Sequence, residues 1–308
     1  MNIVFMGTPR FAAVALERLL HAGEEICLVV SQPDRERGRG RKLAPTPVKE
    51  VAMNHGVLLE QPATPKLPHF VDLLTGISPE LIVVVSYGHI LKSNILTLPK
   101  RGCVNVHPSL LPKYRGAAPM QWTIIRGEVE TGVTTFFMND KMDSGDIIEQ
   151  IALPVGQDEI FGELEQRLAH SGAELLLSTV QLLKRGEAKR YPQDDSKATY
   201  APKIDAEMCR IDWSQDAKHI SGLIRGLSPQ PGAYCSFRGK RLKFLRAHAV
   251  DDVISGEPGE LCSSGTRLLV KTGKGGVWIT ELQPEGRRPM KDSDFINGYH
   301  PRPHERME

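Results

Sequence analysis

The most strongly apolar short stretch of the chain is Leu81–Ser86, LIVVVS, in which the first five residues are all apolar. A strand with no polar face is typical of parallel sheets that are covered by helices on both sides. Near the N-terminus, Asn2–Met6 and Ile26–Ser31 are also short apolar runs, and Phe11–Ala22 between them has apolar residues at helical spacing. These segments predict a β-α-β unit with a right-handed crossover, within a doubly wound, mostly parallel α/β sheet.

Composition limits the class of protein. The 308 residues suffice for two domains, and an apolar content of 40% with a charged content of 25% is that of a soluble globular protein. The N-terminus carries no basic leader, and no stretch approaches the roughly 20 apolar residues of a membrane span, so we expect a cytoplasmic protein without membrane contact. Five cysteines without a C-x-x-C pair are expected to be reduced thiols: Cys27, Cys103, Cys209, Cys235 and Cys262.

Polar side chains gather where another predicted strand ends, in the stretch Cys103–Gly116, CVNVHPSLLPKYRG. Alternate residues of a strand face the same way, so Asn105 and His107 lie side by side, and Pro108 ends the strand. In α/β folds ligands bind at such strand ends. The Ser109–Pro112 loop that follows is apolar and proline-containing, and could wall a pocket for a flat heteroaromatic ligand. A lone Asn or His on a strand is more often structural.

The complete string is more specific than its parts. Asn-x-His followed by Ser-Leu-Leu-Pro resembles the active-site strand and loop of the formyltetrahydrofolate-dependent formyltransferases. The match continues through Lys113–Pro119, KYRGAAP, and the RGAAP portion narrows it to the members that act on methionyl-tRNA. The family's GTPxFA opening is similar to Gly7–Ala12, GTPRFA, which lacks the glycines of a dinucleotide-binding G-x-G-x-x-G turn. The resemblance implies 10-formyltetrahydrofolate as formyl donor, aminoacylated initiator tRNA as acceptor, and no metal.

The resemblance also implies three catalytic residues: Asn105, His107 and Asp143. Three aspartates crowd the turn at 140–146, and turn chemistry alone leaves the choice among them open. The family's Met-Asp-x-Gly turn matches Met142–Gly145 and selects Asp143. Asn105 and His107 would donate hydrogen bonds to the oxyanion, while Asp143 would hold the imidazolium and accept the amine proton. The implied folate-site residues, from the SLLP and YGxIL loops, are Ser109, Leu110, Leu111, Pro112, Tyr87, Gly88, Ile90 and Leu91.

A basic segment, Gln32–Lys49, separates the first β-α-β unit from the next predicted helix. Between Pro33 and Lys49 it has six basic and two acidic residues, an excess larger than the net charge of +2 of the whole chain. Its glycines and prolines predict no regular element, so a solvated surface loop is one interpretation. The other is an arm that orders against tRNA phosphates. The resemblance favours the arm, with the family's key arginine at Arg39 among the predicted tRNA-binding residues Arg35, Arg37, Arg39, Arg41 and Lys42.

The C-terminal third is patterned differently. A helix predicted over Ile160–Arg185 ends at Gly186, and a polar, proline-interrupted stretch follows. We therefore expect a catalytic domain at 1–186, a linker at 187–206 and a tRNA-binding domain at 207–308. Short strand-like segments between glycine-rich turns predict a small all-β, OB-like barrel. One predicted hairpin is strongly basic, which is either a solvated face or a tRNA contact; the predicted contacts here are Lys203, Arg238, Lys240, Arg241 and Lys243.

Four other functions fit parts of the sequence. His-Pro-Ser-Leu-Leu-Pro, with Pro108 after the histidine, is also the form found in glycinamide ribonucleotide formyltransferases, but those have no C-terminal barrel. An amino-sugar nucleotide formyltransferase would need neither the basic arm nor the RGAAP sequence. A folate-dependent hydrolase or sensor would not need the basic arm. An RNA-binding protein without catalytic activity would have no use for the three implied catalytic residues. Nothing in the sequence indicates an obligate oligomer, and we expect a monomer.

Overall fold

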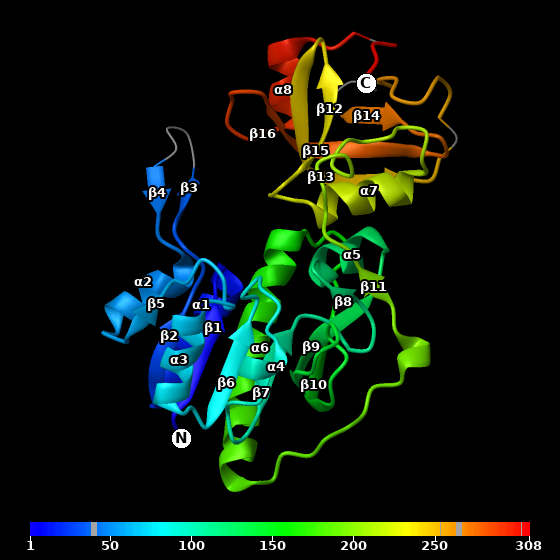
Figure 1. Cartoon of the computed structure of the whole chain (residues 1–308). Coiled ribbons are helices and arrows are strands. Elements are labelled where there is room, and N and C mark those ends of the chain that lie inside the picture. Colours follow the sequence, from blue (N-terminus) through cyan, green and yellow to red (C-terminus); the bar gives the residue numbers. More distant parts are fainter. Residues whose placement is uncertain (38–41, 253, 263–266, 303) are drawn as a thin grey trace. The chain divides into compact units, whose positions relative to one another are not determined.

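The computed structural model describes residues 1–37, 42–252, 254–262, 267–302 and 304–308. The chain forms two compact units, and both are discontinuous in sequence (Figure 1). The first unit comprises Met1–Gly116, Gly132–Leu153 and Glu165–Tyr200, and the second comprises Ala117–Thr131, Pro154–Leu164 and Ala201–Glu308. The domain boundaries at 186 and 206 remain a sequence-based prediction.

A seven-stranded sheet forms the centre of the first unit, in the order β10-β9-β7-β6-β1-β2-β5. Pairing is parallel between β1 and β2, β1 and β6, β6 and β7, and β2 and β5, whereas β9 runs antiparallel to β7. This confirms the predicted doubly wound, mostly parallel sheet. The strands are β1 (Ile3–Gly7), β2 (Ile26–Val30), β5 (Leu59–Glu60), β6 (Leu81–Val85), β7 (Cys103–His107), β9 (Glu130–Phe137) and β10 (Ile147–Pro154).

Helices cover both faces of this sheet. On one face, Phe70 and Leu74 of α3 (Pro68–Ile77) and Ile95 of α4 (Ser93–Leu96) join a buried cluster with alternate residues of β1, β2 and β6. On the other, α6 (Phe161–Arg185) bonds to the sheet through Thr179, whose hydroxyl lies 2.8 Å from that of Thr135 in β9. The two-sided cover explains why β1 and β6 are apolar throughout.

The basic segment is more regular than the sequence analysis predicts. Its ends pair as a two-stranded antiparallel hairpin, β3 (Arg35–Arg37) and β4 (Lys42–Ala44), drawn as a projecting arm in Figure 1. The prediction of no regular element was therefore wrong. Gly38 and Gly40 lie outside the described residues, whereas the residues on either side of them pair. The Thr46 hydroxyl then accepts from the Lys49 N–H and caps α2 (Pro47–Asn54).

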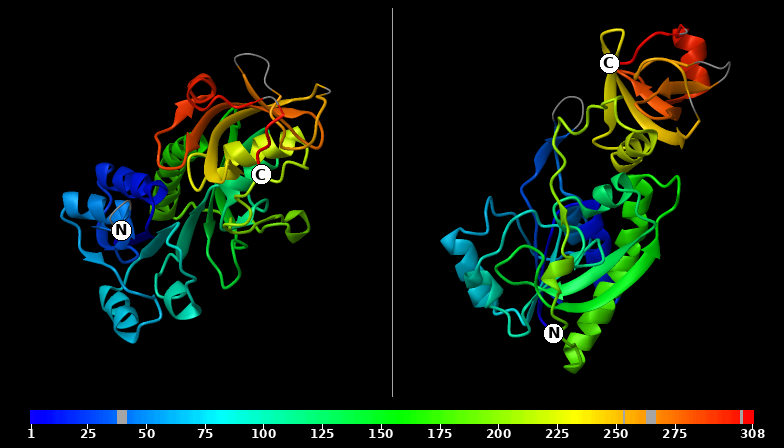
Figure 2. Two further views of the ribbon diagram at one scale, coloured as in Figure 1. Left: turned by 90° about the horizontal axis from the view of Figure 1, so that it is seen from above. Right: turned by 90° about the vertical axis from the view of Figure 1, so that its right-hand side faces the viewer.

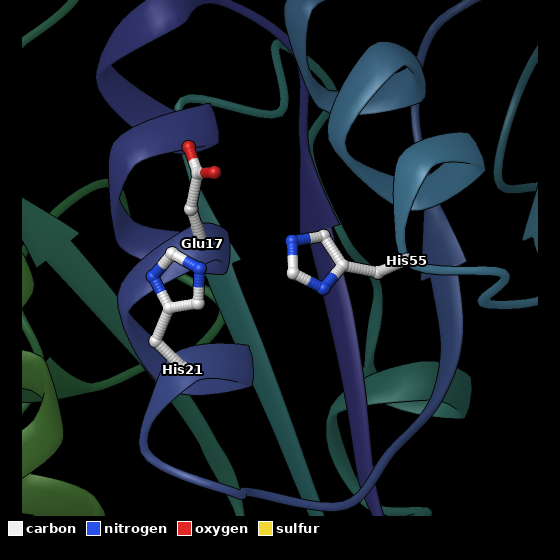
Figure 3. Close-up of side chains that lie close together, drawn as sticks. All are labelled: Glu17, His21 and His55. Atoms are coloured by element: carbon white, nitrogen blue, oxygen red, sulfur yellow. The ribbon is translucent and has the colours of Figure 1, made fainter.

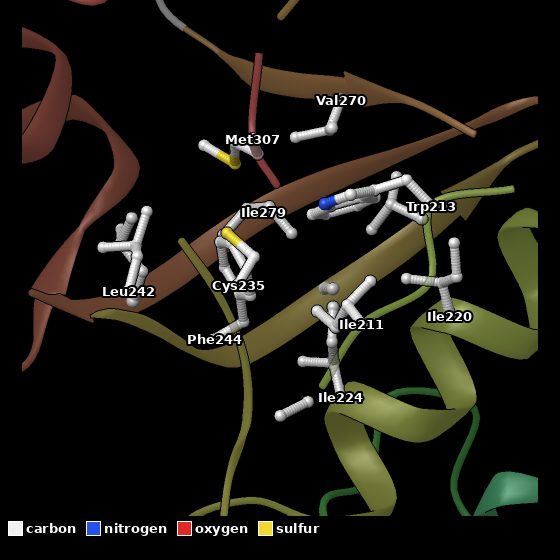
Figure 4. Close-up of a cluster of buried hydrophobic side chains, with 14 of the residues drawn as sticks. Ile211, Trp213, Ile220, Ile224, Cys235, Leu242, Phe244, Val270, Ile279 and Met307 are labelled. Atoms are coloured by element: carbon white, nitrogen blue, oxygen red, sulfur yellow. The ribbon is translucent and has the colours of Figure 1, made fainter. Parts of the chain in front are cut away.

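The second unit contains a curled antiparallel sheet in the order β12-β13-β15-β14, with β16 paired to β15. Its core includes the edge-to-face pair Trp213 and Phe244, whose ring centroids lie 5.8 Å apart (Figure 4). Two helices that the sequence analysis does not predict, α7 and α8, accompany the barrel-like sheet. Of these, α7 packs against β13 (Figure 2). The elements are α5 (Pro119–Ile125), α7 (Ala217–Gly226), β12 (Ala233–Phe237), β13 (Lys240–Val250), β14 (Leu268–Lys271), β15 (Gly276–Pro284), β16 (Met290–Lys291) and α8 (Asp292–Tyr299).

Three short elements complete the description: β8 (Arg115–Gly116), β11 (Tyr200–Ala201) and the 3-10 turn η1 (Asp195–Lys197). β8 and β11 pair with each other. Among the described residues, no helix has both the length and the apolar character that crossing a membrane would require.

Candidate active site

The site is built on β7, which lies between β6 and β9 near one end of the order. Asn105 pairs across the sheet with Val84 on one side and Phe136 on the other. Its side chain is partly exposed, and its amide makes no hydrogen bond within the described part of the chain. His107, two residues on, is 5% exposed. The strand therefore presents a free amide donor beside an enclosed imidazole.

Within the described part of the chain, the ring of His107 is hydrogen-bonded through one of its two nitrogens. Its Nε2 donates to the Tyr114 carbonyl at 2.9 Å, since a carbonyl can only accept. Its Nδ1 lies 3.8 Å from Oδ2 of Asp143, beyond hydrogen-bond distance. Nδ1 is thus the nitrogen that can exchange a proton or hydrogen bond with a bound molecule, with the carboxylate close enough to stabilise positive charge on the ring.

Asp143 is held in a demanding conformation. Its φ is +49°, a left-handed value that Asp tolerates better than most residues, and its Oδ2 accepts from the Gly116 N–H at 2.8 Å. Gly145 completes the turn because a Cβ there would lie 1.7 Å from the Phe137 carbonyl oxygen. The Met-Asp-x-Gly pattern thus has a backbone explanation, and it aims this carboxylate at the imidazole.

The other two aspartates of the turn have different partners. The Ser93 hydroxyl donates to Asp140 Oδ1 at 2.9 Å, and Asp146 pairs with Arg190 at 3.6 Å. Of the three carboxylates, Asp143 is the one that the structure brings within 4 Å of His107.

The SLLP loop is rigidly tied to the sheet. The Thr134 hydroxyl of β9 donates to the Ser109 carbonyl at 2.7 Å and accepts from the Leu111 N–H at 3.1 Å. Gln150 of β10 donates to the Leu111 carbonyl at 2.9 Å, and the Ser109 hydroxyl donates to the Lys113 carbonyl at 2.7 Å. These polar groups of Ser109 and Leu111 are already paired, so a ligand would meet the apolar side of the loop, where Leu110 is only partly buried and Pro112 follows a cis peptide.

The residues of the second predicted folate-site loop, 87–91, differ in their exposure to solvent. Tyr87 and Leu91 are core residues, and burial raises the pKa of the Tyr87 hydroxyl to about 12. The Tyr87 carbonyl accepts from Gln32 at 2.9 Å. Gly88 has φ +84°, and Ile90 is 73% exposed. Ile90 and the backbone around Gly88 are therefore the parts of this loop that can face a ligand.

Two residues outside the predicted set brace the site. The buried Arg115 donates from Nε and Nη2 to the side-chain oxygen of Gln193, at 3.1 and 2.7 Å. The same amide donates from Nε2 to the carbonyls of Asp143 and Gly145, at 2.9 and 2.8 Å. Gln193 therefore clamps the turn that carries the carboxylate. It lies in the stretch predicted as a linker, where a single polar residue gives no signal of such a contact.

Cys103, at the start of the same strand, has a different character. Burial raises the pKa of its thiol to about 12. The thiolate is the nucleophilic form of cysteine, so this side chain is not a nucleophile at neutral pH. The chemistry of the site is left to amide, imidazole and carboxylate groups.

The predicted tRNA-binding residues fall into three groups. Arg39 and Arg41 lie outside the described residues; of Arg37 and Lys42 the structure describes the backbone, and Arg35 is exposed and donates to Gln32 at 2.7 Å. In the second unit, Lys203 is exposed, and Lys243 is half-buried with its stem against Gly232. Arg238, Lys240 and Arg241 line a cavity of about 570 Å³ together with Phe237 and Tyr299.

The cations that line this cavity differ in availability. Arg238 forms two hydrogen bonds to the Glu305 carboxylate, at 2.6 and 2.8 Å, so its charge is largely compensated. Arg241 stacks over the Tyr234 ring, with its guanidinium carbon 4.0 Å from the centroid, and Lys240 is exposed. Lys240 and Arg241 are the better candidates for phosphate contacts.

Known proteins share both the sequence and the domain order. Residues 1–180 match the formyl transferase family, and residues 203–300 match the formyl transferase C-terminal domain. A methionyl-tRNA formyltransferase of Geobacter sulfurreducens is 43% identical over 100% of this chain and 96% of its own length. One from Moorella thermoacetica is 47% identical over 97% of this chain and 96% of its own. The chain belongs to the methionyl-tRNA formyltransferase family.

Solved structures show that the chain shares its fold with more distant proteins. The sugar 3N-formyltransferase WlaRD aligns with a TM-score of 0.69 at 17% identity, covering 94% of this chain and 99% of its own. HypX of Aquifex aeolicus, solved in complex with tetrahydrofolic acid, aligns with a TM-score of 0.64 at 20% identity, covering 97% of this chain and 47% of its own. At these identities the likeness concerns the fold alone.

Proposed function

We propose that this protein transfers the formyl group of 10-formyltetrahydrofolate to the α-amino group of methionyl initiator tRNA, giving N-formylmethionyl-tRNA for translation initiation. The observation that carries the proposal is the 43–47% identity to methionyl-tRNA formyltransferases over nearly the whole chain, including the C-terminal unit. Because tRNA charging and translation occur in the cytoplasm, the proposal implies a cytoplasmic enzyme, and we treat it as a monomer.

The donor set at the end of β7 fits a formyl-bearing folate. A carbonyl oxygen requires hydrogen-bond donors. The Asn105 amide, which has no partner among the described residues, is a donor, and Nδ1 of His107 is a donor when it carries a proton. Exposed Ile90 and the partly buried Leu110 supply apolar contact for a heteroaromatic ring. The folate would supply the activated formyl group. The residues in reach can bind and polarise that group without a metal.

We assign the reaction to the three residues as follows. Asn105 donates to the formyl oxygen as negative charge develops on it, and protonated His107 donates to the same oxygen from Nδ1. The Tyr114 carbonyl keeps the imidazole in place through Nε2. Asp143 stabilises the imidazolium and accepts the proton that the attacking amine loses, directly or through water, and this proton is then passed to the departing folate nitrogen. Each step uses a group that is already oriented.

For tRNA binding, the proposal uses two basic surfaces. One is the β3–β4 arm, in which Arg39 is the expected key residue; the other is the surface of the barrel around Lys240 and Arg241. The Phe237 and Tyr299 rings beside these cations add apolar surface next to the charges. Neutralising several phosphates would supply most of the affinity for the acceptor end.

An acceptor assay tests the proposed function. The enzyme and 10-formyltetrahydrofolate are incubated separately with methionyl initiator tRNA, methionyl elongator tRNA, free methionine and a nucleotide-linked amino sugar. We expect formylation of initiator methionyl-tRNA only. Formate release without an acceptor would indicate a hydrolase, and transfer to the sugar alone would overturn the tRNA assignment while leaving the formyl chemistry in place.

A further inference from the structure

Two histidines and a glutamate meet on the surface of the first unit, away from β7. Glu17 and His21 stand four residues apart on α1 (Arg10–His21), which places them on the same face of that helix. His55, the residue that caps the C-terminus of α2, faces them from the neighbouring helix (Figure 3). One ligand atom from each of the three residues lies within 4.8 Å of the other two.

No other interaction explains the placement of all three side chains. The two imidazole rings meet edge to face, with centroids 5.5 Å apart, which accounts for the histidines alone. Within the described part of the chain, none of the three side chains forms a hydrogen bond or an ion pair. Arg18, the basic residue adjacent to Glu17, is instead paired with Glu174 at 2.6 Å. The carboxylate of Glu17 is therefore left beside two imidazoles without a cation.

The position also favours a positive charge. His21 is the last residue of α1 and His55 follows the last residue of α2, so both imidazoles lie at helix C-termini. The C-terminal end of a helix dipole carries a partial negative charge that attracts cations. Two neutral imidazoles and one carboxylate add a formal charge of −1, which a divalent ion would more than balance.

We propose that Glu17, His21 and His55 bind a divalent transition-metal ion, with Zn²⁺ as the best fit. A ligand set of imidazole nitrogens and a carboxylate oxygen suits Zn²⁺ and other divalent first-row transition metals, whereas Mg²⁺ and Ca²⁺ prefer oxygen ligands alone. Ligand atoms about 2.0–2.1 Å from a tetrahedral Zn²⁺ lie about 3.3 Å apart. All three side chains are exposed, so rotation about their own bonds can close the remaining gap, and water can complete the coordination.

The bound ion would join two helices that the fold otherwise connects by packing. α2 is the element that directly follows the β3–β4 arm, so the ion would anchor the C-terminal end of that helix to α1. An ion that binds the folded chain and not the unfolded one stabilises the folded state by mass action. The proposal is independent of the catalytic assignment, because it involves no residue of β7 or the Asp143 turn.

Titration of the metal-stripped full-length protein with ZnCl₂ by calorimetry tests the proposal. We expect one site per chain in the wild type and a rise in melting temperature with added Zn²⁺. His55→Ala should weaken binding at least about tenfold, since even changes outside a ligand set typically cost about 10–100-fold. Glu17→Gln, which preserves size and helix propensity, should also weaken it. His69→Ala removes an exposed histidine of α3 and should leave the affinity unchanged.

Titration with Co²⁺ separates this site from the cysteine thiols, because thiolate ligands give an intense near-ultraviolet charge-transfer band. We expect that band to be absent and the visible spectrum of bound Co²⁺ to be lost in His55→Ala. The proposal would be overturned if the wild type bound no Zn²⁺, if His55→Ala and Glu17→Gln bound it with wild-type affinity, or if the band showed thiolate ligation.

Discussion

At the scale of single residues, the candidate site depends on an imidazole whose two nitrogens have different tasks. Nε2 of His107 is committed to the Tyr114 carbonyl, while Nδ1 lies 3.8 Å from Oδ2 of Asp143, beyond hydrogen-bond distance. The side-chain amide of Asn105 beside it makes no hydrogen bond to any described residue. The residues are therefore prepared for a ligand rather than for each other, which is what pre-organised electrostatic stabilisation requires.

Asn105→Ala should lower kcat by about 10²–10³, the usual cost of losing one oxyanion donor, because no other described side chain offers the same amide at the end of β7. The KM for tRNA should change little, since Asn105 is expected to act on the formyl oxygen. Steady-state formylation kinetics measure both. Asn94→Ala, at an exposed position of α4, is the matched control. An unchanged kcat would remove Asn105 from the reaction.

Gln193→Glu tests the clamp on the Asp143 turn. The substitution keeps an oxygen acceptor for Arg115 but replaces the N–H donors to the Asp143 and Gly145 carbonyls with a carboxylate. A displaced catalytic group can cost up to about 10² in rate, so we expect kcat to fall while the KM values for folate and tRNA stay near wild type. Gln166→Glu on the exposed side of α6 is the control. A fall in melting temperature with normal kcat would show a merely structural role.

At the scale of elements, the β3–β4 arm, which we propose binds tRNA phosphates, has an ion pair at its base. Asp34 accepts from Gln61 at 2.8 Å and from Lys49 at 2.6 Å. The hydrogen bond from Gln61 and then that from Lys49 hold the pKa of Asp34 below its ordinary value. The base of the arm is thus joined by one carboxylate to Gln61, which directly follows β5, and to Lys49 of α2.

Asp34→Asn should remove the pH-dependent contribution that this carboxylate makes to the stability of the protein. A carboxyl whose pKa is lowered on folding stabilises the protein above its unfolded pKa, about 3.9, and that contribution is lost as pH falls through the lower folded pKa. The difference in melting temperature between wild type and Asp34→Asn should be largest near neutral pH and shrink below about pH 4. Thermal melts across this range measure it. A difference that stayed constant with pH would contradict the assignment.

Arg39→Ala should raise the KM for initiator methionyl-tRNA and leave the KM for 10-formyltetrahydrofolate unchanged, because the arm is expected to contact phosphates. Removing one phosphate contact should reduce the salt slope of tRNA binding by about 1. Binding measured at several salt concentrations gives the slope. Lys66→Ala removes an exposed charge elsewhere on the first unit and serves as the control. Equal slopes for Arg39→Ala and wild type would exclude a phosphate contact.

The sequence predicted strands better than it predicted helices or the hydrogen bonds of Gln193 to the Asp143 turn. The apolar runs at Ile26–Ser31 and Leu81–Ser86 coincide with β2 and β6 to within a residue, because burial in the sheet leaves a clear pattern. α7 and α8 were missed because they lie among short strands and turns. The β3–β4 pairing was missed because the glycines and prolines of this segment argue against a regular element, whereas strand pairing also depends on the partner strand.

At the scale of the whole molecule, the sequence motifs indicated the chemistry, whereas the three-dimensional contacts had to come from the structure. The Met-Asp-x-Gly match selected Asp143, yet only the fold shows that Gly116 and Gln193 hold its turn from both sides of the chain. Such contacts join residues 27 to 78 positions apart. No local pattern encodes them, because the partners are brought together by the sheet and not by their own neighbours.

The chain-length match to the methionyl-tRNA formyltransferases makes one claim central: that the imidazole of β7 carries formyl transfer to charged tRNA. Single-turnover formylation of methionyl initiator tRNA by His107→Ala, with tRNA binding measured in parallel, tests it most directly. We expect the transfer rate to fall by at least about 10² while the Kd for tRNA stays at the wild-type value. A wild-type rate with intact binding would contradict the assignment of the active site.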